Sequence, residues 1–201
     1  MSNNRSDWFP TSVWYFDVEN YESLNQKLLK AIYAEKQRDG QGVLMSNAGG
    51  WHSVENFQVR PEFKDFVNLV SANALQVAQE INWDLQKVRL SVNSCWGMVN
   101  GKFASNYIHN HPNSILSGVY YVQAPENCGG LFFRDPRESA HIFLPPVAEI
   151  SPWTLQKVTY KPLEGRTIVF PSWLMHGVEP NMSDRDRVSI SFNIGMLANT
   201  Q

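Results

Sequence analysis

The amino-acid sequence predicts a mainly antiparallel β fold, a sandwich or a barrel, with helices packed outside it. Apolar residues recur at helical spacing in the first half of the chain, and short segments rich in β-forming residues follow one another in the second half. Helices followed by strands, with few helical signals among the strands, are typical of this class. With 201 residues, 43% of them apolar, the chain suits one domain with a sizeable core.

Two helices are expected before residue 85. The first lies around residues 22–36, where Leu24, Leu28 and Ile32 recur at helical spacing, and it should stop at the glycines that follow. The second begins near Pro61, a residue that a first helical turn tolerates. Its apolar stripe consists of Phe63, Phe66, Val67, Val70, Ala74, Val77, Ala78 and Ile81. Both helices are expected to cover one face of a sheet.

Strand signals begin after residue 86. Six segments are rich in β-forming residues and are separated by Gly, Pro and Asn: residues 87–99, 117–123, 129–135, 155–162, 165–171 and 187–195. We therefore divide the single domain, residues 1–201, into a helical and loop support (1–85) and a β core (86–197). The segment 48–58 is expected to be a loop, in which Trp51, His52 and Ser53 could line a pocket or only pack against the sheet.

Charge and hydropathy narrow the class of partner. The formal net charge is −2, without a long run of one sign, which argues against nucleic acid or an anionic membrane as the main partner. No apolar stretch approaches 18 residues and no secretory leader is visible, so we expect a cytoplasmic protein. Cys95 and Cys128 are expected to be reduced and buried. Whether two copies form a homodimer is left open.

Two of the five histidines, His109 and His111, flank a single asparagine. Side chains two residues apart in an extended chain point the same way, so both imidazoles can reach one point. Neutral imidazole is a common ligand of Fe, Zn, Cu and Ni. The pair alone also fits two surface or hydrogen-bonding histidines. His176, which follows a strand and a proline turn, is a third candidate, although a lone histidine there is usually structural.

The last predicted strand has two unlike faces. Val188, Ile190 and Phe192 are apolar and should face the packed side. The other face carries one arginine and three small polar side chains: Arg187, Ser189, Ser191 and Asn193. This row is either a solvated surface or, inside a barrel mouth, a recess in which the arginine holds a carboxylate.

Taken in order, five motifs resemble the Fe(II)/2-oxoglutarate-dependent dioxygenases: "HNH", "SGVYYVQ", "GGLFF", "GRTIVFPSWLMH" and "RVS". Within that superfamily the chain is most similar to the prolyl-hydroxylase-like branch and to 2-oxoglutarate oxygenases of bacteria and phages. The resemblance covers residues 90–195. It implies a double-stranded β-helix, which is a jelly-roll or cupin-like barrel, and the cofactors Fe(II) and 2-oxoglutarate. It also implies hydroxylation of a substrate, with release of succinate and CO₂. The resemblance does not set the substrate, which we expect to be a small molecule or a peptide, because the many aromatic residues could line a groove, although they fit a core equally well.

The resemblance assigns roles to individual residues. His109 and His176 would bind iron, and His111 stands where the family usually has Asp or Glu. The distal carboxylate of 2-oxoglutarate would be bound by Arg187, with Ser189 beside it, and by Tyr121.

Further residues near the iron-binding segment are less specific. Trp96, Asn100 and Asn106 could line the mouth of the site, but they fit core packing and loop hydrogen bonds equally well. Adjacent strand residues face opposite ways, so only one of Tyr120 and Tyr121 can face the cosubstrate, and we assign that role to Tyr121.

The histidine at position 111 leaves alternatives open. A carboxylate elsewhere, such as Asp135, could complete an ordinary set of two histidines and one carboxylate. A cupin-type three-histidine metalloenzyme that does not use 2-oxoglutarate would share the barrel, but it would leave Arg187 and Tyr121 without a role. A non-catalytic barrel that serves as a binding module is the third alternative.

Overall fold

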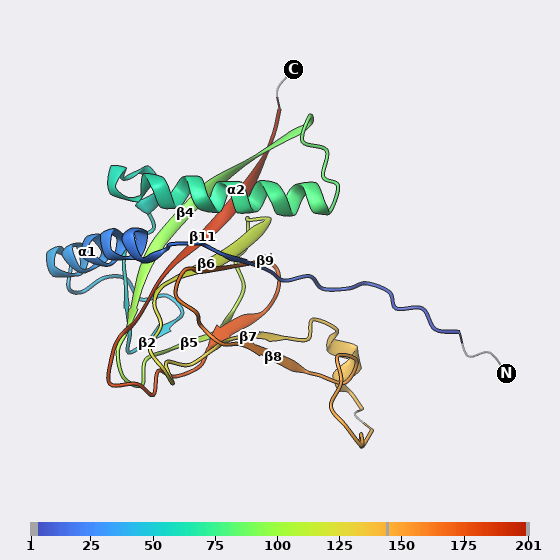
Figure 1. Ribbon diagram of the computed structural model, residues 1–201. Helices are drawn as coiled ribbons and strands as arrows, with labels where there is room; N and C mark the ends of the chain where they lie inside the picture. The colour runs from blue at the N-terminus through green and yellow to red at the C-terminus, as the bar shows by residue number, and fades with distance from the viewer. Residues whose placement is uncertain (1–3, 144, 200–201) are drawn as a thin grey trace.

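The computed structural model describes residues 4–143 and 145–199 of the chain. Two sheets face each other, and both α-helices lie on the outer side of the larger sheet (Figure 1). The fold class is therefore mainly β with supporting helices, as the sequence predicts. Within the described residues neither sheet closes on itself, so the β core is a sandwich of two open sheets and not a closed barrel.

The larger sheet has six strands. In spatial order they are β1 (Trp14–Asp17), β9 (Arg166–Pro171), β6 (Leu116–Gln123), β11 (Arg187–Ala198), β4 (Val88–Asn100) and β3 (Trp51–His52). β11 pairs with β4 along its whole length, from Arg187 opposite Asn100 to Ala198 opposite Val88, and it pairs with β6 on its other side. The first residues of β11 are therefore held in the interior of the sheet.

The smaller sheet has five strands, all of them short. In spatial order they are β2 (Asn47–Ala48), β5 (Ser105–His109), β10 (His176–Val178), β7 (Leu131–Arg134) and β8 (Lys157–Tyr160). β5 and β10 run antiparallel, with His109 directly opposite His176. This register brings together two histidines that are far apart in the sequence.

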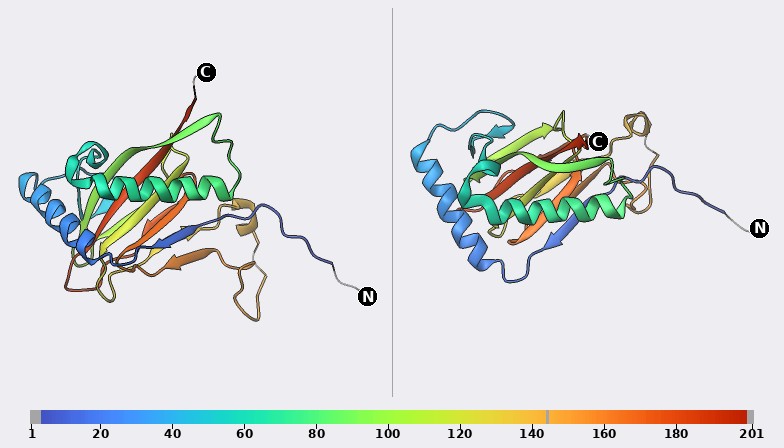
Figure 2. Two further views of the ribbon diagram at one scale, coloured as in Figure 1. Left: turned by 45° about the horizontal axis from the view of Figure 1, so that its top comes forward. Right: turned by 90° about the horizontal axis from the view of Figure 1, so that it is seen from above.

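Both helices lie close to their expected positions. Figure 2 shows that they cross the same side of the larger sheet. Their bounds, and those of three 3-10 turns, are α1 (Glu22–Arg38), α2 (Lys64–Glu80), η1 (Phe57–Val59), η2 (Pro61–Phe63) and η3 (Glu138–His141). Most of the predicted stripe of α2 is buried, whereas Ile81, just past the helix end, is 38% exposed. No helix among the described residues is long and apolar enough for a transmembrane span.

The main core fills the space between the helices and the larger sheet. Phe66 of α2 packs its ring against Tyr120 of β6, with 5.6 Å between ring centroids, and against Phe192 of β11, with 6.1 Å. Val188 and Ile190 are buried on the same face of β11 as Phe192. Because side chains alternate along a strand, the residues between them point toward the smaller sheet.

The first 85 residues also supply three edge strands, which the sequence did not indicate. β1 pairs with β9, β3 pairs with β4, and β2 extends the smaller sheet beside β5. β3 lies inside the segment 48–58 that was expected to be a loop. Trp51 of β3 is buried in the core, and its indole N–H donates to the carbonyl of Asp39 (2.7 Å), so it packs against the sheet and does not line the cavity described below.

Candidate active site

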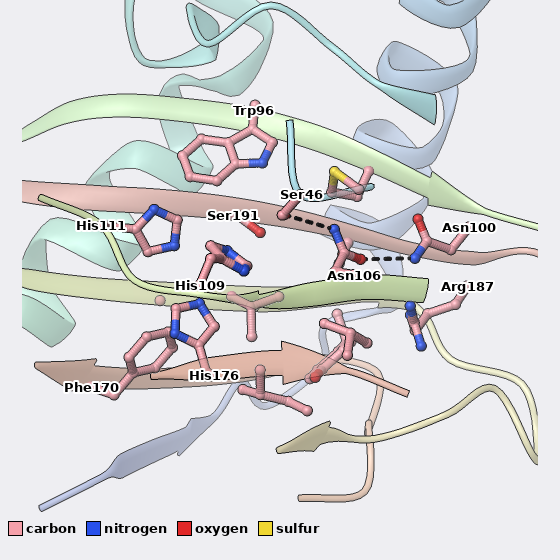
Figure 3. A pocket seen from close by; sticks show the side chains of 17 residues that line it. Ser46, Trp96, Asn100, Asn106, His109, His111, Phe170, His176, Arg187 and Ser191 are labelled. Atoms are coloured by element: carbon pink, nitrogen blue, oxygen red, sulfur yellow. Dashed lines mark hydrogen bonds between the residues drawn. The ribbon is translucent and has the colours of Figure 1, made fainter. Parts of the chain in front are cut away.

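Three histidine side chains meet in a cavity between the two sheets (Figure 3). His109, His111 and His176 each offer one ring nitrogen as a ligand atom, and these atoms lie within 4.8 Å of one another. Among the residues that the structure describes, no other group of three potential metal ligands lies so close together. β5 ends at His109 and β10 begins at His176, which explains why these two rings are neighbours.

Backbone hydrogen bonds orient the first and third imidazoles. The ring of His109 donates its Nδ1–H to the carbonyl of Tyr107 (2.7 Å), and the ring of His176 donates its Nδ1–H to the carbonyl of Leu174 (2.8 Å). Each ring therefore keeps the lone pair of Nε2 for a ligand, as is usual for metal-binding histidines.

His111 is placed by its backbone and by an aromatic neighbour. It follows β5 by two residues, and its backbone N–H donates to the carbonyl of Ser172 (2.9 Å). Its ring lies against the indole of Trp96, with 5.7 Å between ring centroids, and the indole stacks on His52 on its other side (5.4 Å). The third ring therefore has a different kind of support from the first two.

The electrostatics of the cluster favour neutral imidazoles. Burial, with repulsion from neighbouring histidines, lowers the pKa of His111 to about 4 and that of His176 to about 3. Burial also lowers the pKa of His109. A neutral imidazole has a free lone pair, so the cluster is ready to bind a metal near neutral pH without first losing protons.

Arg187 lies at the opposite end of the cavity from His111 (Figure 3). Its side chain is buried, and Nη1 donates to the carbonyl oxygens of Cys128, Gly129 and Glu179. It forms no ion pair with a carboxylate of the described residues, and burial lowers its pKa. A buried guanidinium without a counter-ion is costly, and its shape matches a carboxylate. This end of the cavity therefore fits a carboxylate ligand.

Tyr121 and Ser189 are cross-strand partners on β6 and β11, and both line the cavity beside Arg187. Tyr120 points the other way, into the helical core, where its hydroxyl donates to Oδ1 of Asn25 (2.6 Å). Tyr121, and not Tyr120, therefore lies on the cavity side, as the alternation of side chains along the strand predicts.

The cavity is narrow, with a volume of about 50 Å³, which is several times what one water molecule needs. Trp96, Asn100 and Asn106 line it, and so do Ser46 and Ser191. Asn100 donates to Asn106 (3.1 Å), and Asn106 donates to the hydroxyl of Ser46 (3.2 Å), so a polar row crosses the cavity wall between the histidines and Arg187 (Figure 3).

Sequence reasoning missed Ser46, because it stands beside a two-residue strand that has no periodicity. It named His52 as a possible pocket residue but did not predict its stacking on Trp96, since β3 is equally short. Ser191 was recognisable only as one member of the polar row on β11.

Asp135, the rival third ligand, is engaged elsewhere. Its carboxylate accepts hydrogen bonds from Nε (3.0 Å) and Nη2 (2.7 Å) of Arg137. It is not part of the group of potential ligands formed by the histidines. The structure therefore places Asp135 in the turn, paired with an arginine, which is the role that its sequence neighbours suggested.

Comparison with known proteins decides the family. Residues 94–193 match the family model described as "Putative 2OG-Fe(II) oxygenase". The chain is a 2OG-Fe(II) oxygenase. No curated protein has a sequence that matches the chain. The family match confirms the resemblance seen in the motifs and favours neither the cupin-type metalloenzyme nor the non-catalytic barrel. The cofactors are Fe(II) and 2-oxoglutarate, and the donor set fits both of them.

Solved structures of other oxygenases have the same fold. A prolyl-4-hydroxylase from Pseudomonas putida superposes with a TM-score of 0.65 at 13% identity, over 92% of each chain. A Trichoplax adhaerens prolyl hydroxylase, solved with a peptide fragment of hypoxia inducible factor, gives 0.61 at 14% identity, over 91% of this chain and 83% of that one. HygX from Streptomyces hygroscopicus, solved with nickel, 2-oxoglutarate and hygromycin B, gives 0.59 at 14% identity, over 92% and 83%. The oxygenase therefore has the double-stranded β-helix fold of these enzymes.

Proposed function

We propose that this oxygenase binds Fe(II) through three histidines, without a carboxylate from the protein: His109, His111 and His176. The proposal is supported by the cluster of their ring nitrogens within 4.8 Å and by the pairing of Asp135 with Arg137. Two rings are held by backbone carbonyls so that Nε2 faces the cluster. Three neutral imidazoles leave the remaining coordination positions of the metal to the cosubstrate and O₂.

We propose that 2-oxoglutarate binds with its distal carboxylate on Arg187, assisted by Tyr121 and Ser189. The observation that carries this proposal is the buried guanidinium without a carboxylate partner among the described residues, in the same cavity as the histidines. A ligand carboxylate would supply the missing counter-ion and accept hydrogen bonds from the guanidinium. The tyrosine and serine hydroxyls could donate to its remaining lone pairs.

The chain's own residues would position the reactants and exclude water. With both cofactors bound, the metal would supply the chemistry in which O₂ gives one oxygen atom to 2-oxoglutarate, which becomes succinate and CO₂, and the other to the substrate, which is hydroxylated. Arg187 would fix one end of the cosubstrate, so that its 2-oxo acid end points toward the histidines. Trp96 and Phe170, which line the cavity beside the histidines, would keep it closed to bulk solvent.

The substrate is proposed to be a small molecule or a peptide. The Trichoplax enzyme was solved with a peptide fragment, and HygX with hygromycin B. A cytoplasmic location and the absence of nucleic-acid binding stay predictions from the sequence, and the formation of a homodimer stays open.

The test is a calorimetric titration of 2-oxoglutarate into metal-loaded protein, with succinate formation as a second measurement. Arg187→Ala should weaken 2-oxoglutarate binding about 10- to 100-fold, since a charge-assisted bidentate pair contributes about 1.5–3 kcal/mol. Metal content should stay close to that of the wild type. Arg185→Ala is the matched control, because Arg185 is exposed and only two residues away. Equal affinities in the wild type and Arg187→Ala would remove Arg187 from the site.

A further inference from the structure

A second, more open hollow adjoins the histidines from outside. Its volume is about 530 Å³, within the range of small-molecule sites. It shares Ser46, Trp96, His109 and His111 with the inner cavity, whereas Arg187 lines only the inner cavity. A molecule in this outer hollow would therefore reach the metal-binding histidines from the side opposite Arg187.

Apolar and aromatic side chains form one part of the wall of the outer hollow, and polar side chains form the rest. The apolar part consists of Met45, Trp96, Tyr107, Ile108 and Pro112. Met45 is 61% exposed and Tyr107 is 67% exposed, so large apolar and aromatic groups stand open at the mouth. An organic body placed here would cover these groups and gain free energy by removing them from water.

Among the residues that the structure describes, Glu55 is the one that brings a carboxylate to the wall of the outer hollow. It lies in the loop that follows β3, accepts a hydrogen bond from Ser94, and forms no ion pair with a residue that the structure describes. Glu55 is exposed to solvent, yet partial burial of its carboxyl group raises its pKa. A partly desolvated carboxylate of this kind is stabilised by a cation brought close to it.

Two charges that have no counter-ion among the described residues thus line the two hollows that meet at the histidines. Arg187 lines the inner cavity and Glu55 lines the outer hollow. We infer that the outer hollow is the substrate site and that it takes an organic ammonium group carried on an apolar body, with Glu55 as counter-ion. This inference rests on the proposed function, in which the inner cavity is filled by 2-oxoglutarate. The cation of the substrate and the anion of the cosubstrate would then approach the metal from opposite ends.

The test compares three probes of similar size that differ in charge: 2-phenylethylamine, 2-phenylethanol and phenylacetate. Their affinities for the metal-free Arg187→Ala variant are measured by calorimetry, so that the carboxylate cannot bind at Arg187 and the result does not depend on turnover. The amine should bind roughly fivefold more tightly than the alcohol, and the carboxylate most weakly, because one ion pair at the edge of solvent is worth about that factor. Raising the salt concentration should reduce the difference.

Glu55→Gln, added to Arg187→Ala, should remove the preference for the amine. Glu80→Gln, at the exposed end of α2, is the matched control and should keep the preference. An acetylated pentapeptide with a central lysine, and the same peptide with norleucine, identify the source of the ammonium group. Preference for the lysine peptide would point to a polypeptide, and preference confined to phenylethylamine would point to a free amine.

Three results would overturn the inference: no binding of either ammonium probe, equal binding of the amine and the carboxylate, or a preference that persists in Glu55→Gln. None of these results would affect the proposed function, because the titration of 2-oxoglutarate into Arg187→Ala tests that separately. Conversely, an unchanged affinity in Arg187→Ala would refute the cosubstrate assignment while leaving the amine preference of the outer hollow measurable.

Discussion

The two faces of β11 differ in polarity and in what they contact. Val188, Ile190 and Phe192 are fully buried against the helical layer, while Arg187 and Ser189 point into the cavity. On the apolar face, each side chain gains by leaving water. On the polar face, a buried cation has no counter-ion within the described part of the chain, and it is stabilised only when a ligand supplies one. Alternate residues of one strand therefore have two roles: one set stabilises the fold, and the other set lines the ligand cavity.

The largest effect is expected on the apolar face. Phe192→Ala should lower the free energy of unfolding by about 3–5 kcal/mol, because it leaves a cavity beside Phe66. Urea denaturation measures this change. Phe103→Ala is the control, since Phe103 is 63% exposed, and its effect should stay within about 0.5 kcal/mol. A loss below 1 kcal/mol for Phe192→Ala would show that the apolar face does not carry the stability assigned to it.

Metal binding should depend strongly on the histidines that line the cavity. Loss of a residue that merely supports a metal ligand typically costs about 10- to 100-fold in affinity, so His111→Ala should weaken Fe(II) binding by more than about 100-fold. Asp135→Asn should bind normally, and His111→Asp should retain Fe(II), because it restores the usual carboxylate. Anaerobic metal titration distinguishes these outcomes. Full iron in His111→Ala together with little in Asp135→Asn would replace the three-histidine site with an ordinary triad.

Arg187→Met should separate stability from ligand binding on the polar face. Without ligands, this variant should be at least as stable as the wild type, since an unpaired buried cation is replaced by an apolar side chain. Saturating 2-oxoglutarate should raise the melting temperature of the metal-loaded wild type but not that of the variant. Scanning calorimetry measures both quantities. A strongly destabilised variant would mean that the three carbonyl contacts of Arg187 hold the fold together.

The smallest effects concern the neighbouring tyrosines. Tyr121→Phe should weaken 2-oxoglutarate binding about fivefold, the value of one hydrogen bond, with little change in stability. Tyr120→Phe should lower stability by about 1 kcal/mol, because it removes a hydrogen bond to Asn25, and it should leave 2-oxoglutarate affinity unchanged. Calorimetry and denaturation measure these two quantities. The opposite pattern would show that Tyr120, and not Tyr121, binds the cosubstrate.

The sequence predicted the long elements well, because periodicity accumulates over many residues. The alternation along β11 and the stripe of α2 each span several repeats, and both faces were assigned correctly. The two cysteines are free and buried, as expected. The lining of the inner cavity was therefore largely predictable from the polar row of β11 and from the resemblance of the sequence motifs to those of oxygenases.

The outer hollow was not predictable in this way. Glu55 and His52 lie in or next to a strand of two residues, and Ser46 precedes another. Such short strands form only because they pair with strands that are distant in the sequence. No local sequence pattern therefore predicts them. The pairing of β10, a strand of three residues, with β5 is long-range in the same sense.

The direct pairing of His109 with His176 has a consequence for folding thermodynamics. The two rings become neighbours only after the smaller sheet has assembled, so the unfolded chain offers no comparable site. A metal ion that binds only the folded state adds its binding free energy to that of folding, about 2.7 kcal/mol at a free concentration of one hundred times Kd. The ion should thus stabilise the smaller sheet, whose strands are short. Chelators should lower the melting temperature of the protein in a concentration-dependent way.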